Sequence, residues 1–527
     1  MKNKKLLLSL VLLTSCGSTI NRTTFEVSSL ISNANLYIKE NLNYVVNDYK
    51  GDFHLNSRIG WLNDPNGFSE FDGKYHLFYQ YNPYDAVWGS MHWGHQTTED
   101  FVKWDLQDVA LAPDQDYDQN GCFSGSALVN DNKLFVAYTA VDQDWNQDQA
   151  IAYSEDGVTF KKLDNNPIIK GKDLPYGFSH PNFRDPKIFS RDNKFYMLVG
   201  NENTITKDKQ VVIFETSTIE QGWEYKGVIY ARQDVGGMIE CPDLFTIGNH
   251  DILVISPQSL RNDVYYEYQN VDSCLYQIGN LSTNSYKYYS APNVGIEEFD
   301  KGFSFYAPQV LKTSDGRHIL TAWMKAWAEA NVTQTDGWAG SMVFPRELTL
   351  ENNHIYQTPV RELKNYYKDT YQEELVTLEN NQISINDIKD NKCSIELTIN
   401  IGESSKNTKA GIEVYKNQNY STKIYYDVDK GCVVFDRSDC GSVLDGIRYA
   451  KVEPIDDKIK LQILLDVSSC EVFINDGYYT QTGNVFAPLD ATDISLFVED
   501  GKASFEKITY NHIDINKGGN VWKSKSI

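Results

Sequence analysis

From about residue 51 to residue 350, apolar positions come in short runs that are rich in aromatic and β-branched residues. Examples are "KYHLFYQYNP", "KLFVAYTAV", "KFYMLVGN", "QVVIFETST" and "DILVISPQ". Each run is bounded by Gly, Asn, Asp or Pro, and helical periodicity is nearly absent. Such runs predict β-strands joined by tight turns. Many short, evenly spaced strands are typical of a sandwich, a barrel or a propeller.

The same region shows a loose recurrence of its parts. A turn with an acidic residue and Pro precedes a strand, and a hairpin such as "FDGKY" or "RDNKFY" leads to the next strand. Strings such as "YSEDGVTFKKLD" and "ETSTIEQGWEYKG" fit equivalent outer strands of different blades. This recurrence favours a propeller over residues 51–350.

After this region the pattern changes twice. Residues 351–375 contain "PVRELKNYYKDTYQEEL", which is charged and fits a helix, so we expect a linker there. Residues 376–520 then alternate cleanly between apolar and polar positions, with Ile395, Leu397 and Ile399 on one face. "NDG" and "EDG" are typical hairpin turns. The chain is therefore expected to be all-β, with an antiparallel sandwich as its second domain.

The first 16 residues have the layout of a lipoprotein-type signal peptide. Lys2, Lys4 and Lys5 precede an apolar run that is far shorter than the ~20 residues of a membrane-spanning helix. "LTSCG" then resembles a bacterial lipobox, with Cys16 as the residue that would carry lipid. An ordinary signal peptide or a chance apolar start are the alternatives.

Residues 17–50 predict a polar tether followed by one short amphipathic helix. If the leader is processed, the protein is a lipoprotein on the extracellular face of the cell membrane, and the lipid anchor is its only membrane contact. If the leader is not processed, a cytoplasmic location is expected instead.

Composition narrows the function. The net charge is −23, and no basic face of the kind that nucleic-acid binding needs is visible. Neutral substrates tolerate an acidic surface, whereas an anionic substrate would require a local basic pocket. Aromatic residues make up 13% of the chain, which suits stacking on sugar rings but also fits the coding bias of an AT-rich genome.

The cysteines and histidines indicate no metal site. Apart from Cys16 there are seven cysteines, an odd number whose spacing fits neither a disulfide framework nor a zinc site. Most are expected to be small buried residues, and a pair between Cys432 and Cys440 stays open. The nine histidines show no ligand spacing.

Three acidic residues lie close to proline in unusual settings. Asp64 lies in "WLNDPNG", Asp185 in "NFRDPKIF" and Glu240 in "GGMIECPDLF". A lone Asp-Pro usually marks a structural turn, and "NDPNG" has strong turn chemistry. Only a closed fold brings such distant positions together, as the innermost strands of propeller blades do. Glycoside hydrolysis needs one ionised and one protonated carboxyl group.

The local sequence suggests how these two roles are divided. We expect backbone N–H donors in the turn around Asp64 to hold that carboxylate as the anion. The apolar neighbours Met238, Ile239 and Cys241 should instead favour the protonated form of Glu240.

The motifs, taken in order, resemble glycoside hydrolase family 32, the invertases and fructanases. They are "WLNDPNG", "FYQYNP", "WGSMHWGH", "GCFSGSA", "FRDP", "ECPDLF", "FYAPQ" and "GWAGSMVFPREL". "LDVSSCEVFINDG" resembles the signature of the family's sandwich domain. The resemblance covers about residues 51–515.

This resemblance implies a five-bladed β-propeller, a C-terminal β-sandwich and a retaining β-fructofuranosidase that uses no metal or organic cofactor. Asp64 would be the nucleophile and Glu240 the general acid and then base. Asp185 would hold the hydroxyl groups of the sugar. The first two carboxyl groups should then lie about 5–5.5 Å apart. The residues expected to line the sugar pocket are Asn63, Gln80, Trp88, Phe123, Ser124, Arg184 and Trp338.

Two positions depart from the family pattern. Ser304 stands where the family commonly has Asp, and Met342 or its neighbours stand where it commonly has Gln. These departures put substrate preference in doubt rather than hydrolysis.

The resemblance leaves the substrate open. "ALAPDQDYDQNGCFSGSALV" is closest to sucrose-6-phosphate hydrolases, which act inside cells, whereas the leader points outward to sucrose or fructans. The small carbohydrate partner is therefore sucrose, sucrose 6-phosphate or a fructan end. A fructosyltransferase and an inactive carbohydrate-binding lipoprotein remain the other classes.

Overall fold

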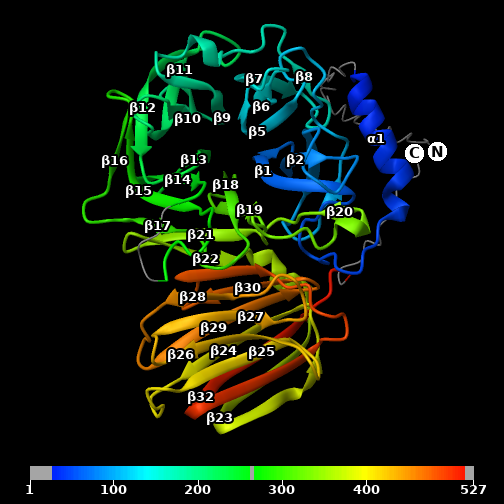
Figure 1. Ribbon diagram of the computed structural model, residues 1–527, viewed down its shortest axis with the longest axis vertical. Helices are drawn as coiled ribbons and strands as arrows, with labels where there is room; N and C mark the ends of the chain where they lie inside the picture. Colours follow the sequence, from blue (N-terminus) through cyan, green and yellow to red (C-terminus); the bar gives the residue numbers. More distant parts are fainter. Residues whose placement is uncertain (1–26, 261–265, 517–527) are drawn as a thin grey trace, which may run out of the picture.

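The computed structural model describes residues 27–260 and 266–516, which form two β-rich domains, one above the other in Figure 1. The upper domain has five sheets arranged around a central axis, and the lower domain is built from one ten-stranded sheet. The expected all-β fold, a five-bladed propeller followed by a C-terminal sandwich, is confirmed.

Each blade is an antiparallel sheet whose first strand lies nearest the axis. Blade 1 contains β1 (Gly60–Phe71), β2 (Lys74–Asn82), β3 (His92–Thr98) and β4 (Asp105–Leu106). Blade 2 contains β5 (Gly121–Asn130), β6 (Lys133–Val141), β7 (Gln147–Ser154) and β8 (Lys161–Lys162). Blade 3 contains β9 (Phe178–Arg191), β10 (Lys194–Asn203), β11 (Lys209–Thr216) and β12 (Glu224–Arg232).

Blade 4 contains β13 (Ile239–Ile247), β14 (His250–Pro257), β15 (Leu275–Ser282), β16 (Lys287–Ser290) and β17 (Ile296–Glu298). Blade 5 contains β18 (Tyr306–Lys312), β19 (His318–Trp323), β21 (Arg346–Glu351) and β22 (His354–Pro359). The chain between β19 and β21 also supplies β20 (Trp338–Ala339), which pairs in parallel with β1. The last blade is thereby joined to the first, and the ring is closed.

The innermost strands share one irregularity that decides where the acidic residues lie. β1, β5, β9, β13 and β18 each carry a β-bulge, and four of these bulges contain a proline: Pro65, Pro186, Pro242 and Pro308. The expectation that "WLNDPNG" forms a turn was wrong, because it is part of strand β1. Proline lacks an N–H and is accepted in a strand at a bulge, so turn-like residues here mark a bulge.

Polar side chains that follow the bulges connect neighbouring blades around the axis. Asn66 accepts a hydrogen bond from blade 2, and Ser126 accepts one from blade 3. Lys187 forms an ion pair with Asp243, which itself accepts a bond from blade 5. Gln309 of blade 5 contacts blade 1, where its side chain accepts a hydrogen bond from the backbone N–H of Phe68. These contacts hold the five strands at fixed positions around the axis.

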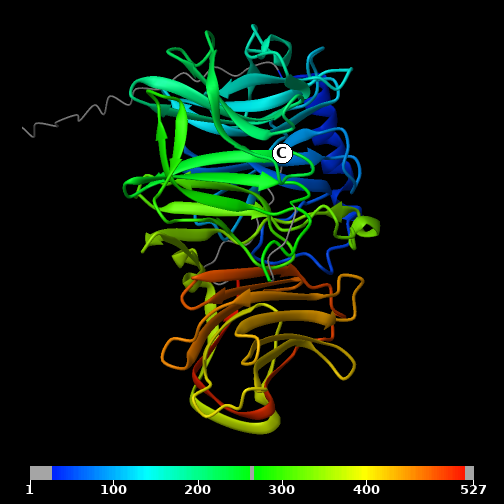
Figure 2. The ribbon, with the colours of Figure 1, turned by 60° about the vertical axis from the view of Figure 1, so that its left-hand side comes forward.

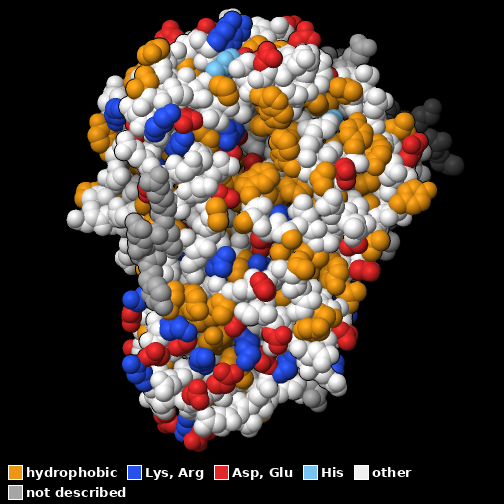
Figure 3. Space-filling model, viewed as in Figure 1, with side chains coloured by type: hydrophobic (Ala, Val, Ile, Leu, Met, Phe, Trp, Pro, Cys, Tyr) orange, Lys and Arg blue, Asp and Glu red, His pale blue; other side chains and the backbone are white. Residues whose placement is uncertain are grey.

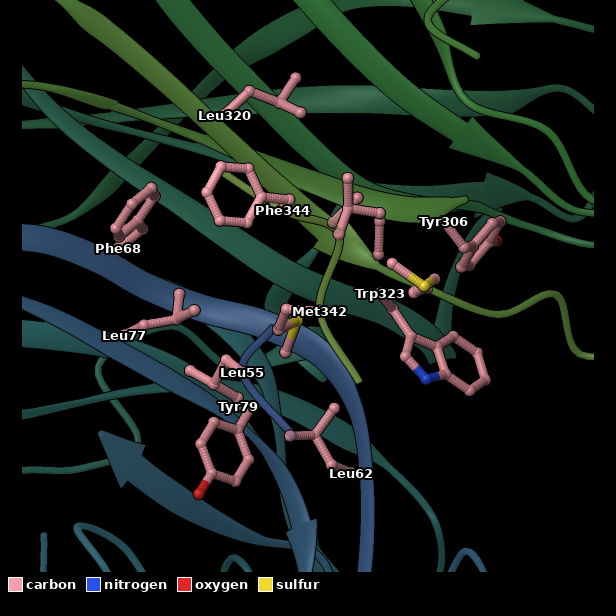
Figure 4. Close-up of a cluster of buried hydrophobic side chains, with 14 of the residues drawn as sticks. Leu55, Leu62, Phe68, Leu77, Tyr79, Tyr306, Leu320, Trp323, Met342 and Phe344 are labelled. Carbon is pink, nitrogen blue, oxygen red and sulfur yellow. The ribbon is translucent and has the colours of Figure 1, made fainter. Parts of the chain in front are cut away.

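The junction between blades 1 and 5 is filled by a cluster of buried hydrophobic side chains. Figure 4 shows Leu62, Phe68 and Leu77 from blade 1 facing Leu320 and Phe344. All of these side chains are buried. Burial of apolar side chains between neighbouring blades stabilises the ring as a whole.

One helix covers the outside of the propeller. Helix α1 (Ser29–Asn41) and the following 3-10 turn η1 (Leu42–Tyr44) run along blade 1 (Figure 1). Ser28 caps the helix, because its side chain accepts a hydrogen bond from Ile31 N–H, and the helix buries Ile31, Ala34 and Ile38. Two further 3-10 turns are η2 (Gly171–Asp173) and η3 (Gln334–Asp336).

The boundary between the domains differs from the expected linker at 351–375. Strand β22 still belongs to blade 5, the 3-10 helix η4 (Arg361–Tyr366) follows it, and β23 begins at Tyr367. β23 pairs with one neighbour and leaves most of its residues from 367 to 380 exposed or half-exposed. An edge strand of this kind has no continuous apolar face. Its sequence therefore lacks the alternation of apolar and polar residues that marks a strand, and a charged segment of this kind fits a helix equally well.

The lower domain folds one sheet into two layers. Its strands are β23 (Tyr367–Lys389), β24 (Cys393–Asn400), β25 (Lys409–Lys416), β26 (Ser421–Asp427), β27 (Cys432–Asp439), β28 (Ile447–Lys451), β29 (Lys458–Asp466), β30 (Ser469–Ile474), β31 (Tyr479–Asn484) and β32 (Asp493–Ile513). The first part of β32 pairs with β25 and the second part with β24, so it belongs to both layers. Figure 2 shows the long strands curving around the domain. Ile395, Leu397 and Ile399 are buried between the layers, as the alternation predicts.

The signal peptide and Cys16 lie in residues 1–26, outside the described residues. Within the described ranges, no helix has the length and apolar character needed to cross a membrane. In the same ranges, seven cysteines are free and buried, and no three His, Cys, Asp or Glu side chains form a group that could hold a metal ion.

Candidate active site

The three predicted carboxylates converge from three blades. Asp64 lies on β1, Asp185 on β9 and Glu240 on β13. Cys241, next to Glu240, connects the first two: its Sγ lies 3.5 Å from Asp64 Oδ2 and 3.7 Å from Asp185 Oδ2. Its backbone N–H also donates to Asp185 Oδ2 at 2.9 Å. The closed fold therefore brings together residues that lie far apart in the sequence.

The two oxygens of Asp64 have different surroundings. Oδ2 accepts a hydrogen bond of 2.7 Å from Ser124 Oγ, whereas Oδ1 is buried and has no hydrogen-bond partner. Burial, followed by the negative charge of Glu240, raises the pKa of Asp64 to about 6, against the opposing effect of the Ser124 hydrogen bond. The expected turn of backbone N–H donors was wrong, because side chains supply the hydrogen bonds to this carboxylate.

Asp185 is buried and surrounded by charged groups. Burial raises its pKa to about 7; Arg184 opposes this effect, while the charges of Glu240 and Asp64 add to it. Its backbone has φ +67°, a left-handed conformation that is unusual for an Asp in a strand. Unusual backbone conformations persist where the surrounding structure enforces them, and they are frequent at functional sites.

Glu240 is held by two donors rather than by apolar contacts alone. Arg184 donates to Glu240 Oε1 from Nε at 3.1 Å and from Nη2 at 2.9 Å. Tyr306 OH donates to Oε2 at 2.7 Å. Met238 and Ile239 are buried as expected, but the hydrogen-bond partners of this carboxylate are a guanidinium and a phenol. Both oxygens of Glu240 thus accept a hydrogen bond, one from Arg184 and the other from Tyr306.

Two of the predicted pocket residues support the strand that carries Asp64. Asn63 is buried, and its Oδ1 accepts a hydrogen bond of 2.8 Å from Trp61 Nε1. Gln80 is also buried and donates to the backbone oxygen of Cys122 at 2.9 Å. Both side chains are fixed by neighbours within blades 1 and 2.

The predicted aromatic residues divide into an exposed pair and a buried residue. Trp88 is 40% exposed and packs edge-on against Phe123, with ring centroids 5.8 Å apart. Trp338 is 1% exposed and lies on β20, where Lys50 Nζ sits 5.3 Å from its ring centroid. Trp88 and Phe123 thus offer an accessible aromatic surface, whereas the Trp338 ring is enclosed by protein.

From the sequence, Cys241 is expected only as an apolar neighbour of Glu240 and Tyr306 has no predicted role, although both residues contact the acids. Each occupies a position in the X-Pro bulges that is equivalent to a functional residue in another blade. Cys241 precedes its proline as Asp64 and Asp185 do, and Tyr306 stands two residues before its proline, as Glu240 does. Aligning the bulges with one another would have identified both residues.

The surface of the molecule differs between the two domains. Figure 3 shows apolar side chains gathered around the centre of the propeller face, with acidic side chains among them. Lys, Arg, Asp and Glu are instead interspersed over the lower domain in the same view. An apolar surface around a few polar groups is typical of a site for a small molecule.

Family models match almost all of the described chain. The model described as "Glycosyl hydrolases family 32 N-terminal domain" matches residues 54–359. The model described as "Glycosyl hydrolases family 32 C terminal" matches residues 362–512. The two matches meet where blade 5 ends and the sandwich begins.

Individual relatives agree with the family models. The chain is 34% identical over 474 residues to a sucrose-6-phosphate hydrolase of Zymomonas mobilis, which covers 86% of this chain and 90% of the relative. The solved sucrose-6-phosphate hydrolase of Lactobacillus gasseri has a TM-score of 0.79 and 27% identity, covering 91% of this chain and 96% of that one. A Bombyx mori family 32 β-fructofuranosidase in complex with sucrose has a TM-score of 0.76 and 28% identity, covering 93% and 99%.

Proposed function

This chain belongs to glycosyl hydrolase family 32 and is a hydrolase of O-glycosidic bonds, and we propose that it releases fructose from sucrose or sucrose 6-phosphate. The relatives named sucrose-6-phosphate hydrolase and β-fructofuranosidase support this choice of substrate. The reaction proceeds with retention, through a covalent fructosyl-enzyme intermediate.

The three acids divide the work of this reaction. Asp64 attacks the anomeric carbon of the fructosyl unit while Glu240 gives a proton to the departing oxygen. Water then attacks the Asp64 ester, and Glu240 takes a proton from that water. Asp185 holds hydroxyl groups of the sugar. The separation of about 5–5.5 Å between the two reacting carboxyl groups stays a prediction of this mechanism.

One observation supports the role of Asp64 above all others. Asp64 Oδ1 is buried and without a partner, while Ser124 fixes the other oxygen at 2.7 Å. A buried polar atom without a partner costs stability, so its presence needs a reason. An oxygen reserved for a bond to carbon provides that reason, and the fixed geometry keeps it ready to react.

The role of Glu240 is tested by the leaving group. Glu240→Gln should lower kcat/KM for sucrose by about 10²–10⁴-fold, because glucose is a poor leaving group that needs a proton. An aryl fructoside with a good leaving group should lose far less. Equal losses on the two substrates would contradict the assignment of Glu240 as the acid.

The substrate is settled by comparing kcat/KM on sucrose, sucrose 6-phosphate and inulin or levan. We expect both sucrose compounds to be cleaved faster than the fructans. Product analysis at high sucrose identifies a fructosyltransferase, since transfer lengthens the sugar chain instead of releasing fructose. Absence of fructose release from every substrate would leave the inactive carbohydrate-binding protein.

The location rests on the leader alone. We propose that Cys16 carries lipid and that the enzyme acts on the extracellular face of the membrane, because the charged start, apolar run and Cys16 occur in order. Cys16→Ser should move the protein from the membrane fraction to the soluble fraction. A preference of more than tenfold for sucrose 6-phosphate would contradict an extracellular role with sucrose.

A further inference from the structure

A buried polar cluster joins the two domains beside the active site. Ser304 is fully buried, and its Oγ lies 2.9 Å from both carboxylate oxygens of Glu329. Arg437, from strand β27 of the sandwich, places Nη2 2.9 Å from Glu329 Oε1. The backbone N–H of Ala326 donates to Oε2 at 3.0 Å. Both oxygens of this carboxylate are therefore bound, and one of the donors comes from the other domain.

These contacts anchor residues 324–333, the loop that follows β19. Lys325 Nζ donates to the backbone oxygen of Glu329, and Asn484 of the sandwich donates to the backbone oxygen of Met324 at 2.8 Å. Arg437 Nη1 in turn donates to the backbone oxygen of Asn484 at 2.6 Å. The sandwich thus holds the loop at two points. Glu329 and Arg437 also line a cavity of about 340 Å³ between the domains.

The same loop packs against the strand that carries the nucleophile. Trp327 stacks on Trp61, with ring centroids 6.3 Å apart, and meets Trp323 edge-on at 4.9 Å. Trp61 Nε1 donates to Asn63, the residue before Asp64. Trp323 pairs with Tyr306 across β18 and β19, and Tyr306 binds the proposed acid. The loop therefore contacts supports of both reacting carboxylates.

We infer that Glu329 is a positioning residue for substrate binding, which fixes the loop through Ser304 and Arg437 so that Trp327 holds Trp61 in place. This inference deepens the proposed function and rests on it. It also gives the departure at position 304 a physical reason. A hydroxyl at 304 donates to the Glu329 carboxylate, whereas Asp there would put two like charges in contact. The carboxylate that the family commonly carries at 304 is here supplied by a different loop.

Glu329→Gln keeps the shape of the side chain and removes its charge. Because the loop reaches the acids only through Trp61 and Trp323, and contacts none of the proton-transfer groups directly, we expect KM for sucrose to rise at least tenfold. We expect kcat to change by less than about threefold, and the pH profile of kcat to stay the same. The matched control is Glu347→Gln, since Glu347 pairs with Arg361 of η4 and with Arg317 of blade 5, and with no residue of the loop. That variant should behave like the wild type.

A double variant separates positioning from general loss of structure. Ser304→Asp alone should raise KM, whereas Ser304→Asp with Glu329→Gln returns one carboxylate to the cluster and should recover at least half of the lost affinity. Wild-type KM in Glu329→Gln would overturn the inference, and so would a fall in kcat and melting temperature that the double variant does not recover.

Failure of the proposed function can be distinguished from failure of the inference about Glu329. If the wild type releases no fructose, the near-ultraviolet circular dichroism of Glu329→Gln still reports on the Trp61–Trp327 contact. A change relative to Glu347→Gln supports the anchoring of the loop, and an unchanged spectrum overturns it.

Discussion

Asp64 in the propeller and Asp466 in the sandwich are both buried, yet their surroundings shift their pKa values in opposite directions. Asp466 accepts hydrogen bonds from the backbone N–H groups of Asp52 and Phe53, at 2.7 and 3.0 Å, and from His54 Nδ1 at 2.8 Å. These contacts overcome burial and lower its pKa. Asp64 has one hydroxyl, one thiol and an oxygen without a partner, so burial and Glu240 raise its pKa to about 6.

Asp466 belongs to a network of charges between the domains. His54 Nε2 lies 2.9 Å from Glu471 Oε1, and Arg346 Nη2 lies 2.6 Å from Glu471 Oε2. Arg346 Nη1 also reaches Asp300 Oδ2 at 3.1 Å, and both side chains are fully enclosed. Despite the cost of its burial, Glu471 has a lowered pKa because Arg346 and His54 stabilise its charge. The structural carboxylates are thus compensated by cations and N–H groups, whereas Asp64 is left partly uncompensated.

The difference shows how the molecule distributes stability. Buried ions persist when every polar atom has a partner, and a site that must form new bonds cannot fill all of its positions in advance. Removing a charge should therefore have opposite consequences for stability in the two regions, as the following variants test.

The largest effect is expected for Asp64→Asn. Removing the nucleophile should lower kcat for sucrose by at least about 10⁴-fold, because no other group in the site is placed to form the covalent intermediate. Fructose release measures the loss, and thermal unfolding at pH 8 should show a melting temperature equal to or above that of the wild type. A variant that is inactive because it unfolds would contradict the comparison.

Glu471→Gln should produce the converse result. It leaves Arg346 and His54 without their shared carboxylate, and breaking a buried ion pair costs about 3–5 kcal/mol of unfolding free energy. Denaturant unfolding measures this loss, while kcat of the folded fraction should stay within a few-fold. The control is Glu403→Gln, whose exposed pair with Lys502 should leave stability unchanged. Equal stability of the two variants would show that the network is not stabilising.

Much of the active site was predictable from the sequence, since Asp64, Asp185 and Glu240 lie in short motifs with a nearby proline. The local structure is harder to predict because a bulge and a turn use the same residues, so "WLNDPNG" predicts a turn although it lies in β1. The repeated X-Pro positions also identify Cys241 and Tyr306, because these residues occupy positions in their bulges that are equivalent to those of the acids in other blades.

The charged network could not be predicted in the same way. His54 and Glu471 lie 417 positions apart, and Arg346 and Glu471 lie 125 apart, so no local pattern connects them. Their pairing depends on how the two domains dock. The edge strand β23 is a different case, because its exposed faces removed the alternation that marks a strand.

The next effect is a pH dependence of stability, which arises from His54 in the charged network between the domains. Burial opposes the charging of His54, but its hydrogen bonds to Asp466 and Glu471 raise its pKa to about 9 from 6.5. A raised folded-state pKa gives stability that is complete below pH 6.5 and is lost as the pH rises to about 9. The stability difference between wild type and His54→Gln should therefore shrink by about 3 kcal/mol over this range. A constant difference would mean that His54 is neutral in the folded protein.

A further effect has the opposite sign and tests the catalytic region directly. Burial and the charges of Glu240 and Asp64 raise the pKa of Asp185 to about 7 from 3.8, against the influence of Arg184. A raised pKa of an acid means that ionisation costs stability, and this cost grows from about pH 4 to pH 7 and is constant above. Asp185→Asn should therefore be more stable than the wild type at pH 8, by about 4 kcal/mol, and indistinguishable from it near pH 4.

Asp466→Asn provides the matched comparison for that gain, since both substitutions remove one buried negative charge. Because the pKa of Asp466 is lowered, its ionised form contributes stability above pH 3.8 that is lost as the pH falls through the folded-state pKa. At pH 8 the Asp466 variant should unfold at a lower temperature than the wild type, and the Asp185 variant at a higher one. Melting curves with shifts of the same sign would mean that burial alone, and not the partners of each carboxylate, decides the cost of the charge.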